Sequence, residues 1–353
     1  MNELYIEDIV KAINSCQNIE LLKNRNIFIT GANGLLGRFI IDLIMYLNNQ
    51  NNYNTTIIAN LRSMNRLKDE FSCYIDNNNF KYYIGDINNP IKYKGKVDFI
   101  INCASNTHPM QYARQPIETI MTNIQGTYNV LEFAAKINAK KTIFLSSVEI
   151  YGENINNIDR FKENEMGYID CNSLRAGYNE GKRAGEALCQ AFIASKNIDI
   201  SIVRLPRIFG PTVKKDDTKA MSQFIKKAIE GDNIVLKSTG EQYFSYLYVA
   251  DAISGILRVL VAGKNGEAYN LGNIKSDIRL KDLAKLIADF AKTKVVFDLP
   301  SETERKGYST ATIARLDYSK IERELEWKPQ YSIQEGIERT ILLLKDKYDK
   351  GDK

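Results

Sequence analysis

The sequence contains very little histidine, and its cysteines are not arranged for cross-linking. Its 353 residues include one histidine, His108, so hydrolysis by a serine–histidine–aspartate triad would depend on that residue, and multi-histidine metal sites are excluded. The five cysteines lie far apart and form no CxxC pair, which favours reduced thiols over a disulfide framework or a zinc site. We therefore expect no bound metal.

Long apolar runs and long runs of one charge are also missing. No stretch of about 18 apolar residues occurs, and residues 1–22 lack the apolar core of a signal peptide. We therefore expect a soluble, cytoplasmic protein without a membrane span. The net charge of +5 is not gathered into a basic stripe, which argues against nucleic-acid binding. Mild basicity suits a protein whose ligands carry phosphate.

Short apolar runs alternate with helical patterns over the first 200 residues, as in a parallel sheet built from βαβ units. The expected strands are residues 26–30, 55–61, 80–84, 97–102, 142–146 and 198–204. The expected helices between them are residues 34–47, 64–73, 116–137 and 178–195. This alternation predicts an α/β fold with a Rossmann-type, doubly wound parallel sheet.

The alternation loosens after residue 204, which indicates a second and smaller region. The elements expected there are helices at 220–230, 249–260 and 333–344 and short strands at 234–237 and 294–297. We expect residues 1–22 to form a helical extension, with its helix at 4–13, and residues 23–204 to form the Rossmann domain. Residues 205–353 would then be mainly a C-terminal substrate-binding domain, partly interleaved with the first.

The first expected strand runs into a turn with three glycines and then into a helix, in the run Ile27-Phe-Ile-Thr-Gly-Ala-Asn-Gly-Leu-Leu-Gly37. Gly31 permits the tight turn, Gly34 lets the backbone approach a pyrophosphate, and Gly37 lets helix and strand pack closely. The free N–H groups of the helix N-terminus then attract phosphate. A glycine-rich turn alone could be a flexible loop, but at the start of a βαβ series it predicts a dinucleotide site. The residues expected in this part of the site are Gly31, Asn33, Gly34, Leu35, Leu36 and Gly37.

The GxxGxxG spacing resembles that of the short-chain dehydrogenase/reductase superfamily. The pair Asp86-Ile87, just after the third expected strand, resembles the pair that this superfamily uses beside the adenine. The run Asn102-Cys-Ala-Ser105 resembles its turn over the cofactor. The resemblance implies a nicotinamide cofactor, with Asp86, Ile87, Cys103, Ala104 and Ser105 in its site.

The end of the second expected strand bears on which nicotinamide cofactor is bound. NAD-specific sites usually place Asp or Glu there to bind the ribose hydroxyls. Here Arg62 follows the strand, and the first acidic residue is Asp69. Arg62, with Arg66 on the following turn, could pair with a 2′-phosphate, or both could be surface arginines. We expect NADP, with NAD as the alternative.

Tyr178-Asn-Glu-Gly-Lys182 places a phenol and an ammonium four residues apart, on one face of a helix. A nearby lysine charge favours the phenolate and so lowers the pKa of the tyrosine, which would let Tyr178 exchange a proton with a hydroxyl or ketone. With 20 tyrosines the spacing could also be a helix surface pair. It follows the glycine turn and the run Leu145-Ser-Ser-Val-Glu-Ile-Tyr-Gly152 in the right order, however. We expect Tyr178 to be the acid/base and Ser147 to bind the reacting oxygen, while Lys182 also binds the nicotinamide ribose.

These segments resemble the extended branch of the superfamily, the NAD-dependent epimerase/dehydratase family of nucleotide-sugar enzymes. The runs Arg204-Leu-Pro-Arg-Ile-Phe-Gly-Pro211, Tyr248-Val-Ala-Asp251 and Asp317-Tyr-Ser-Lys320 resemble that branch as well. The resemblance covers about residues 24–344, and the UDP-glucuronate decarboxylases look most similar around Tyr178. It implies a nucleotide-sugar substrate and a homodimer formed through the helices expected at 116–137 and 178–195.

Two neighbouring positions bear on the reaction. Glu149 matches a catalytic glutamate of the decarboxylases and 4,6-dehydratases of this branch, or is a solvated loop carboxylate. Val148 stands where the dehydratases carry the aspartate that serves as the acid for water loss. This substitution disfavours dehydration.

Phe244 stands where the branch normally carries an arginine that holds the diphosphate and, in the decarboxylases, helps with the carboxyl group. An apolar ring cannot neutralise a phosphate, so another cation must help. The candidates are Arg207, which replaces a usual asparagine, Lys214 or Lys215, and Arg315. Each could equally be a surface charge.

Thr107 and His108 lie in Ser105-Asn-Thr-His-Pro109, a segment that borders the substrate in this branch. A lone histidine is more often structural. The resemblance nevertheless makes both residues candidates for substrate binding.

Together these features predict an NAD(P)-dependent enzyme that acts on a nucleotide sugar, in surface polysaccharide biosynthesis. Arg62, Val148 and Phe244 favour a keto-sugar reductase or an epimerase. A decarboxylase-like or dehydratase-like lyase is the alternative, supported by Glu149. A non-catalytic, cofactor-sensing regulator is a third hypothesis, disfavoured because the serine, tyrosine and lysine are all present.

Overall fold

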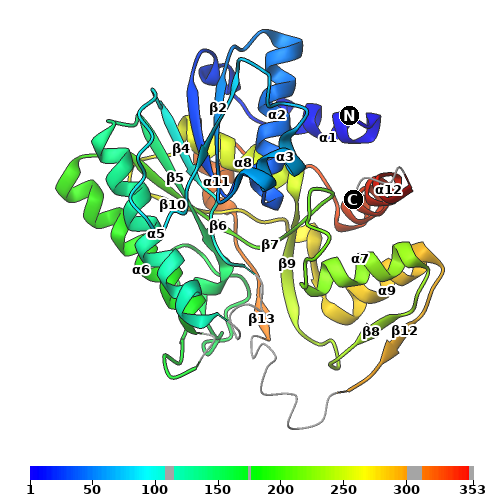
Figure 1. Cartoon of the computed structure of the whole chain (residues 1–353). Coiled ribbons are helices and arrows are strands. Elements are labelled where there is room, and N and C mark those ends of the chain that lie inside the picture. Colours follow the sequence, from blue (N-terminus) through cyan, green and yellow to red (C-terminus); the bar gives the residue numbers. More distant parts are fainter. Residues whose placement is uncertain (108–114, 174–175, 300–311, 350–353) are drawn as a thin grey trace.

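The computed structural model describes residues 1–107, 115–173, 176–299 and 312–349, and its central feature is a parallel sheet (Figure 1). The sheet has seven strands in the order β10-β6-β5-β4-β1-β2-β3. These strands are β1 (Asn26–Thr30), β2 (Thr56–Leu61), β3 (Phe80–Ile84), β4 (Phe99–Asn102), β5 (Lys141–Ser147), β6 (Ile200–Leu205) and β10 (Ala268–Asn270). All its pairings are parallel, so the expected Rossmann-type α/β fold is confirmed.

β1 lies at the point where the strand order reverses. It pairs with β2 on one side and with β4 on the other. In sheets of this type, ligands bind outside the carboxyl ends of the strands at the reversal. β10 has the three residues Ala-Tyr-Asn and was not predicted, because they form no apolar run.

Helices cover both faces of the sheet. These helices are α1 (Glu3–Asn14), α2 (Leu35–Asn51), α3 (Met64–Phe71), α5 (Pro116–Lys136), α6 (Ala176–Lys196) and α8 (Val249–Ala262). α5 and α6 pack against each other on one face, while α1, α2 and α8 pack together on the other. In β1, Phe28 belongs to the core beneath α5 and α6, and Ile27 and Ile29 belong to the core beneath α2 and α8. A strand buried on both faces is apolar throughout, which is why the sequence revealed it.

A smaller mixed sheet lies beyond the carboxyl end of β6. Its central strand, β9 (Tyr243–Tyr248), pairs in parallel with β7 (Arg207–Phe209) and β13 (Ile313–Ala314) and antiparallel with β11 (Asp277–Arg279). Further described elements are the parallel pair β8 (Ile234–Leu236) and β12 (Val295–Phe297), α7 (Ala220–Glu230), α9 (Leu280–Ala291), α11 (Ser319–Leu325), α12 (Ile333–Asp349), and the 3-10 helices η1 (Ile19–Leu22), η2 (Val148–Tyr151) and η3 (Ile274–Ser276). Among the helices of the described residues, none has both the length and the apolar character that a membrane crossing requires.

One buried carboxylate joins the first helix to the last part of the chain. Asp8 on α1 is fully buried and accepts hydrogen bonds from Tyr248 (2.5 Å), Tyr331 (2.7 Å) and Arg339 (2.6 Å).

β10 and α8 follow residue 204 in the sequence and yet join the main sheet and its helical layer. The domain boundaries expected at residues 22 and 204 stay a prediction.

Candidate active site

The glycine turn after β1 is so tight that side chains at its glycines would collide with the backbone. Gly31 has a left-handed φ of +62°, and a Cβ on it would lie 2.9 Å from the backbone of Ala104. A Cβ on Gly37 would lie 2.5 Å from the carbonyl oxygen of Gly31. Gly34 donates its N–H to that same oxygen (2.9 Å) and caps α2. The N-terminus of α2 therefore faces a turn kept free of side chains, as pyrophosphate binding requires.

The other residues expected around the cofactor follow β1, β3 and β4 in the chain. Ile87 is buried, and the rest are half-buried: Asn33, Leu35, Leu36, Asp86, Cys103, Ala104 and Ser105. The hydroxyl of Thr30 accepts the N–H of Ala104 (3.0 Å) and donates to the side-chain oxygen of Asn102 (2.7 Å), which joins the ends of β1 and β4. The glycine turn, the free end of α2 and the two joined strand ends fit a dinucleotide.

Arg62 is exposed immediately after β2, and Arg66 is half-buried in the first turn of α3. Ser63 caps α3 and accepts the N–H of Arg66 (3.4 Å). Glu70 on the same helix lies 3.9 Å from Arg38 instead. Within the described residues, neither Arg62 nor Arg66 has an acidic side chain at ion-pair distance. The two arginines are thus placed as the sequence predicted, at the end of the second strand.

Tyr178, Ser147 and Ser105 form one hydrogen-bonded group at the ends of β4 and β5. Tyr178 lies in the first turn of α6, is 5% exposed, and makes hydrogen bonds with both serines. Ser147 ends β5, and Ser105 follows β4 and donates to the side-chain oxygen of Asn123 on α5 (2.9 Å). The sequence predicted Ser147 beside Tyr178 but assigned Ser105 to the cofactor alone. No pattern in the sequence indicated the contact between Ser105 and the phenol.

Lys182 lies one turn beyond Tyr178 on α6 and is 4% exposed. Its ammonium donates to the carbonyl oxygen of Leu145 (2.7 Å) and lies 6.0 Å from the centre of the Tyr178 ring. Burial lowers the pKa of Lys182 to about 8. Lysine and tyrosine therefore share one face of the helix, as predicted, but the lysine is bonded to β5.

The expected lowering of the pKa of Tyr178 is wrong for this structure. Burial raises the pKa of Tyr178 to about 12, and the charge of Glu149 adds to this, while hydrogen bonds with Ser147 and Ser105 oppose it. Lys182 does not offset the burial, because with a pKa of about 8 it is neutral at the pH where Tyr178 would lose its proton. Tyr178 keeps its proton at neutral pH and is suited to donate it.

Glu149, Arg207 and Phe244 meet next to this group. The N–H of Glu149 donates to Ser147 (3.2 Å), and its carboxylate lies 3.4 Å from the guanidinium of Arg207. That guanidinium lies over the ring of Phe244, 3.5 Å from its centre. One of its nitrogens, Nη1, is buried without a hydrogen-bond partner among the described residues. Val148 is buried in the core, so the position before Glu149 carries no acid.

The remaining substrate candidates are placed differently. Arg315 lies 4.1 Å from the centre of the Tyr243 ring and forms an ion pair with Asp159. Successive residues of a strand point to opposite faces. Because Arg315 packs on Tyr243 and Arg207 packs on Phe244, the two arginines lie on opposite faces of β9. Thr107 is half-buried in the segment after β4. His108 lies outside the described residues.

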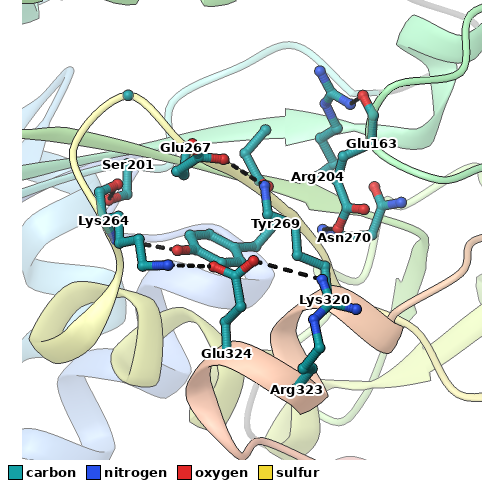
Figure 2. A network of polar contacts seen from close by, with 12 residues as sticks. Glu163, Ser201, Arg204, Lys264, Glu267, Tyr269, Asn270, Lys320, Arg323 and Glu324 are labelled. Carbon is teal, nitrogen blue, oxygen red and sulfur yellow. Dashed lines mark hydrogen bonds and ion pairs between the residues drawn. The ribbon is translucent and has the colours of Figure 1, made fainter.

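A buried charge network fixes the position of α6. Glu186 on α6 accepts hydrogen bonds at 3.0 and 2.7 Å from the guanidinium of Arg204, the fifth residue of β6. Arg204 also donates to the carbonyl of Glu163 (2.7 Å) and to the hydroxyl of Tyr151 (3.0 Å), which donates to Asn270 (2.6 Å). Figure 2 shows Arg204 directed toward Glu163, beside Asn270. Arg204 begins one of the runs that resemble the family, but no pattern in the sequence indicated that it pairs with Glu186.

The chain is similar to UDP-glucuronic acid decarboxylases over most of its length. It is 28% identical over 318 residues to UDP-glucuronic acid decarboxylase 6 of Arabidopsis thaliana. This alignment covers 89% of this chain and 87% of that protein. It is 27% identical over 320 residues to UDP-glucuronic acid decarboxylase 1 of Xenopus tropicalis. That alignment covers 90% of this chain and 71% of the relative.

Solved structures of epimerases share the fold. UDP-glucose 4-epimerase of Thermotoga maritima, solved with UDP-glucose, has a TM-score of 0.78 at 22% identity and covers 92% of this chain and 99% of that one. UDP-glucuronic acid 4-epimerase of Bacillus cereus, in complex with UDP-glucuronic acid and NAD, has a TM-score of 0.77 at 22% identity. The match covers 91% of this chain and 99% of that one. The model of the NAD dependent epimerase/dehydratase family matches residues 27–272, from β1 to just beyond β10. The chain therefore belongs to the NAD-dependent epimerase/dehydratase family and is an enzyme of nucleotide sugars.

Proposed function

We propose that this enzyme transfers hydride between NADP(H) and a carbon of a nucleotide-activated sugar, as a keto-sugar reductase or an epimerase. The observation that carries the proposal is the hydrogen-bonded group of Tyr178, Ser147 and Ser105 beside the glycine turn. A protonated phenol next to a dinucleotide site is what carbonyl reduction needs, because the oxygen must receive a proton as the carbon receives hydride.

The side chains would divide the chemistry as follows. A bound nicotinamide supplies or accepts the hydride. Tyr178 donates its proton to the carbonyl oxygen during reduction, which leaves the phenolate. In the reverse oxidation it is this phenolate that accepts the hydroxyl proton. Ser147 holds the reacting oxygen by a hydrogen bond. Lys182, whose pKa burial lowers to about 8, is largely charged at neutral pH and would bind the cofactor ribose.

Val148 argues against dehydration, because water loss needs a proton donor at the leaving hydroxyl and Val148 is buried and apolar.

Phe244 supplies no charge to the substrate from β9. Arg207 could compensate from β7, since its guanidinium covers the Phe244 ring and one of its nitrogens has no hydrogen-bond partner in the part of the chain that the structure describes. We therefore propose that Arg207 binds an anionic group of the substrate.

A decarboxylase is the second candidate. Glu149 supports it, because the ion pair with Arg207 keeps its carboxylate beside Tyr178, where it could accept a proton from a sugar ring. The curated relatives are named as decarboxylases of UDP-glucuronic acid. Oxidation of a ring hydroxyl would give a ketone, and a carboxylate in the β position to it would leave as CO2.

We further propose a cytoplasmic homodimer that serves surface polysaccharide biosynthesis. Its α5 helix carries exposed apolar side chains on one stripe, at Ile117 (71% exposed), Met121 (43%) and Tyr128 (42%). Such a stripe is suited to pack against a second copy. Light scattering that gives a monomer mass at micromolar concentration would contradict the dimer.

One assay with two readouts tests the reaction. The protein is incubated with NADPH, NADH, NADP or NAD and a panel of UDP-, CDP-, GDP- and dTDP-sugars that includes keto forms. Absorbance of the reduced nicotinamide is followed, and products are weighed by mass spectrometry and separated by chromatography.

Each outcome identifies a reaction. Loss of NADPH with a product heavier by one hydrogen molecule shows a reductase. A product of unchanged mass and altered retention, without net cofactor change, shows an epimerase. A product lighter by CO2 without net cofactor change shows a decarboxylase and overturns the leading proposal.

A further inference from the structure

The segment that follows β7 returns to the cofactor side of the molecule. The hydroxyl of Thr212 donates to the carbonyl oxygen of Leu35 (2.7 Å), which is the first residue of α2. Leu35 directly follows Gly34 of the glycine turn. Residues just after Thr212 are therefore held beside the expected dinucleotide site, although they come from the part of the chain assigned to the substrate.

Lys214, two residues beyond Thr212, is half-buried and lies near the arginines that follow β2. Burial lowers the pKa of Lys214, and the positive charges of Arg66 and Arg62 lower it further, while Glu70 and Asp216 oppose them. The positively charged side chains of Arg62, Arg66 and Lys214 therefore lie close together.

Within the described residues this cluster is only partly neutralised, because Glu70 and Asp216 act on Lys214 from a distance without forming an ion pair with it. Arg62, Arg66 and Lys214 make no side-chain hydrogen bond or ion pair there, and Glu70 is turned to Arg38, which bonds to its backbone and lies 3.9 Å from its carboxylate. Like charges held together repel one another. A dianionic phosphate bound among them would remove that repulsion and gain charge-assisted hydrogen bonds.

We propose that Lys214 is a third determinant of cofactor specificity, which binds the 2′-phosphate of NADP(H) together with Arg62 and Arg66. The inference rests on the proposed use of NADP. It adds that recognition of the 2′-phosphate is completed by the segment between β7 and α7, so that the substrate side of the chain takes part in cofactor selection.

The test is equilibrium binding, which needs no substrate. NADPH and NADH are each titrated into the full-length protein and its variants, and dissociation constants are taken from nicotinamide fluorescence. For Lys214→Ala we expect NADPH to bind about tenfold more weakly, as for loss of a charge-assisted hydrogen bond, and NADH to change less than about twofold. Lys214→Arg should retain most of the preference for NADPH.

Lys215 is the matched control, since its ammonium lies 5.6 Å from the centre of the Tyr348 ring on α12. Lys215→Ala should leave both dissociation constants within about twofold. Thermal melts of every variant without cofactor exclude loss of folding as the cause.

The outcomes separate the two proposals. If the unchanged protein binds NADH as tightly as NADPH, the proposed NADP use fails and this inference fails with it. If Arg62→Ala loses the preference for NADPH while Lys214→Ala keeps it, the NADP proposal stands and only the role of Lys214 is overturned.

Discussion

The surroundings of Arg204 and of Arg207 are opposite in character, although the two arginines lie on consecutive strands. Arg204 is paired with Glu186 and bonded to Tyr151 and to a backbone carbonyl, and its side chain is 6% exposed. The other charged side chains of Figure 2 are also compensated within the protein, as in the ion pair of Lys320 with Glu267 (2.6 Å).

Arg207 has a weaker set of partners. Its ion pair with Glu149 is 3.4 Å long, its main contact is the ring of Phe244, and Nη1 is left without a hydrogen bond in the described structure. The cation cluster of Arg62, Arg66 and Lys214 shares this property more strongly. The contrast separates two uses of positively charged residues. Charges that are fully paired inside the protein hold the fold, and charges that are only partly compensated beside the expected site are available to a ligand anion.

The largest effect that tests this distinction is expected at Tyr178, with the buried Tyr151 as its control. Tyr178→Phe removes the proton donor, so kcat should fall by about 10³-fold to 10⁴-fold. The protein should still bind NADPH, as checked by fluorescence titration. Tyr151→Phe, the matched control in the compensated network, should lower the melting temperature and leave kcat of the folded fraction within about threefold. Equal losses of kcat in the two variants would remove the distinction.

The next largest effect is expected on stability at Arg204. Arg204→Met leaves Glu186 buried without its partner, which should cost about 3 kcal/mol of unfolding free energy, measured by urea denaturation. The double variant Arg204→Met with Glu186→Gln should recover part of this loss, because the unpaired charge is gone. A loss below about 0.5 kcal/mol in the single variant would show that the network does not hold the fold.

The sequence predicted the cofactor half of the molecule better than the substrate half. Strands buried on both faces are apolar runs, and the glycine turn depends on a backbone shape that only glycine adopts at Gly31, so both can be read from the chain. β7, β9, β11 and β13 were missed. β7 and β11 are short and carry charged residues, β13 has only two residues, and β9 mixes four aromatic residues with a serine. β8 and β12 are equally short but were predicted, because they are apolar runs.

The contacts of the site were predictable only where two residues share one helix or one motif. Tyr178 and Lys182 are one turn apart, and their common face follows from helix geometry. The approach of Arg207 to Phe244 depends on the parallel register of β7 with β9, in which Arg207 lies opposite Tyr246. The contact of Ser105 with Tyr178 depends on the meeting of two strand ends. Neither register nor the direction of a side chain is encoded locally.

A smaller effect is expected at Arg207. Arg207→Met removes the cation over Phe244, so the KM for the nucleotide sugar should rise by about tenfold, while the unfolding free energy changes by less than about 1 kcal/mol because its ion pair is partly exposed. Steady-state kinetics and urea denaturation measure the two quantities. The opposite result, an unchanged KM with a loss of stability like that of Arg204→Met, would place Arg207 among the structural arginines.

The smallest effect expected is on the pH dependence of reduction. Burial lowers the pKa of Lys182 to about 8 from its ordinary value, so the lysine is charged at pH 7 and mostly neutral at pH 9. Tyr178, with its pKa raised to about 12, stays protonated over this range. The rate of NADPH oxidation with a keto-sugar should therefore fall about fivefold between pH 8 and pH 9, as Lys182 loses the charge that binds the ribose.

Lys182→Arg provides the control for this profile. Its guanidinium stays charged at these pH values, so the variant, although slower, should lose the decline between pH 8 and pH 9. If the variant keeps the same decline, another group titrates there. Lys182 would then belong with Arg204, as a cation whose bond to the Leu145 carbonyl serves only to hold α6 against β5.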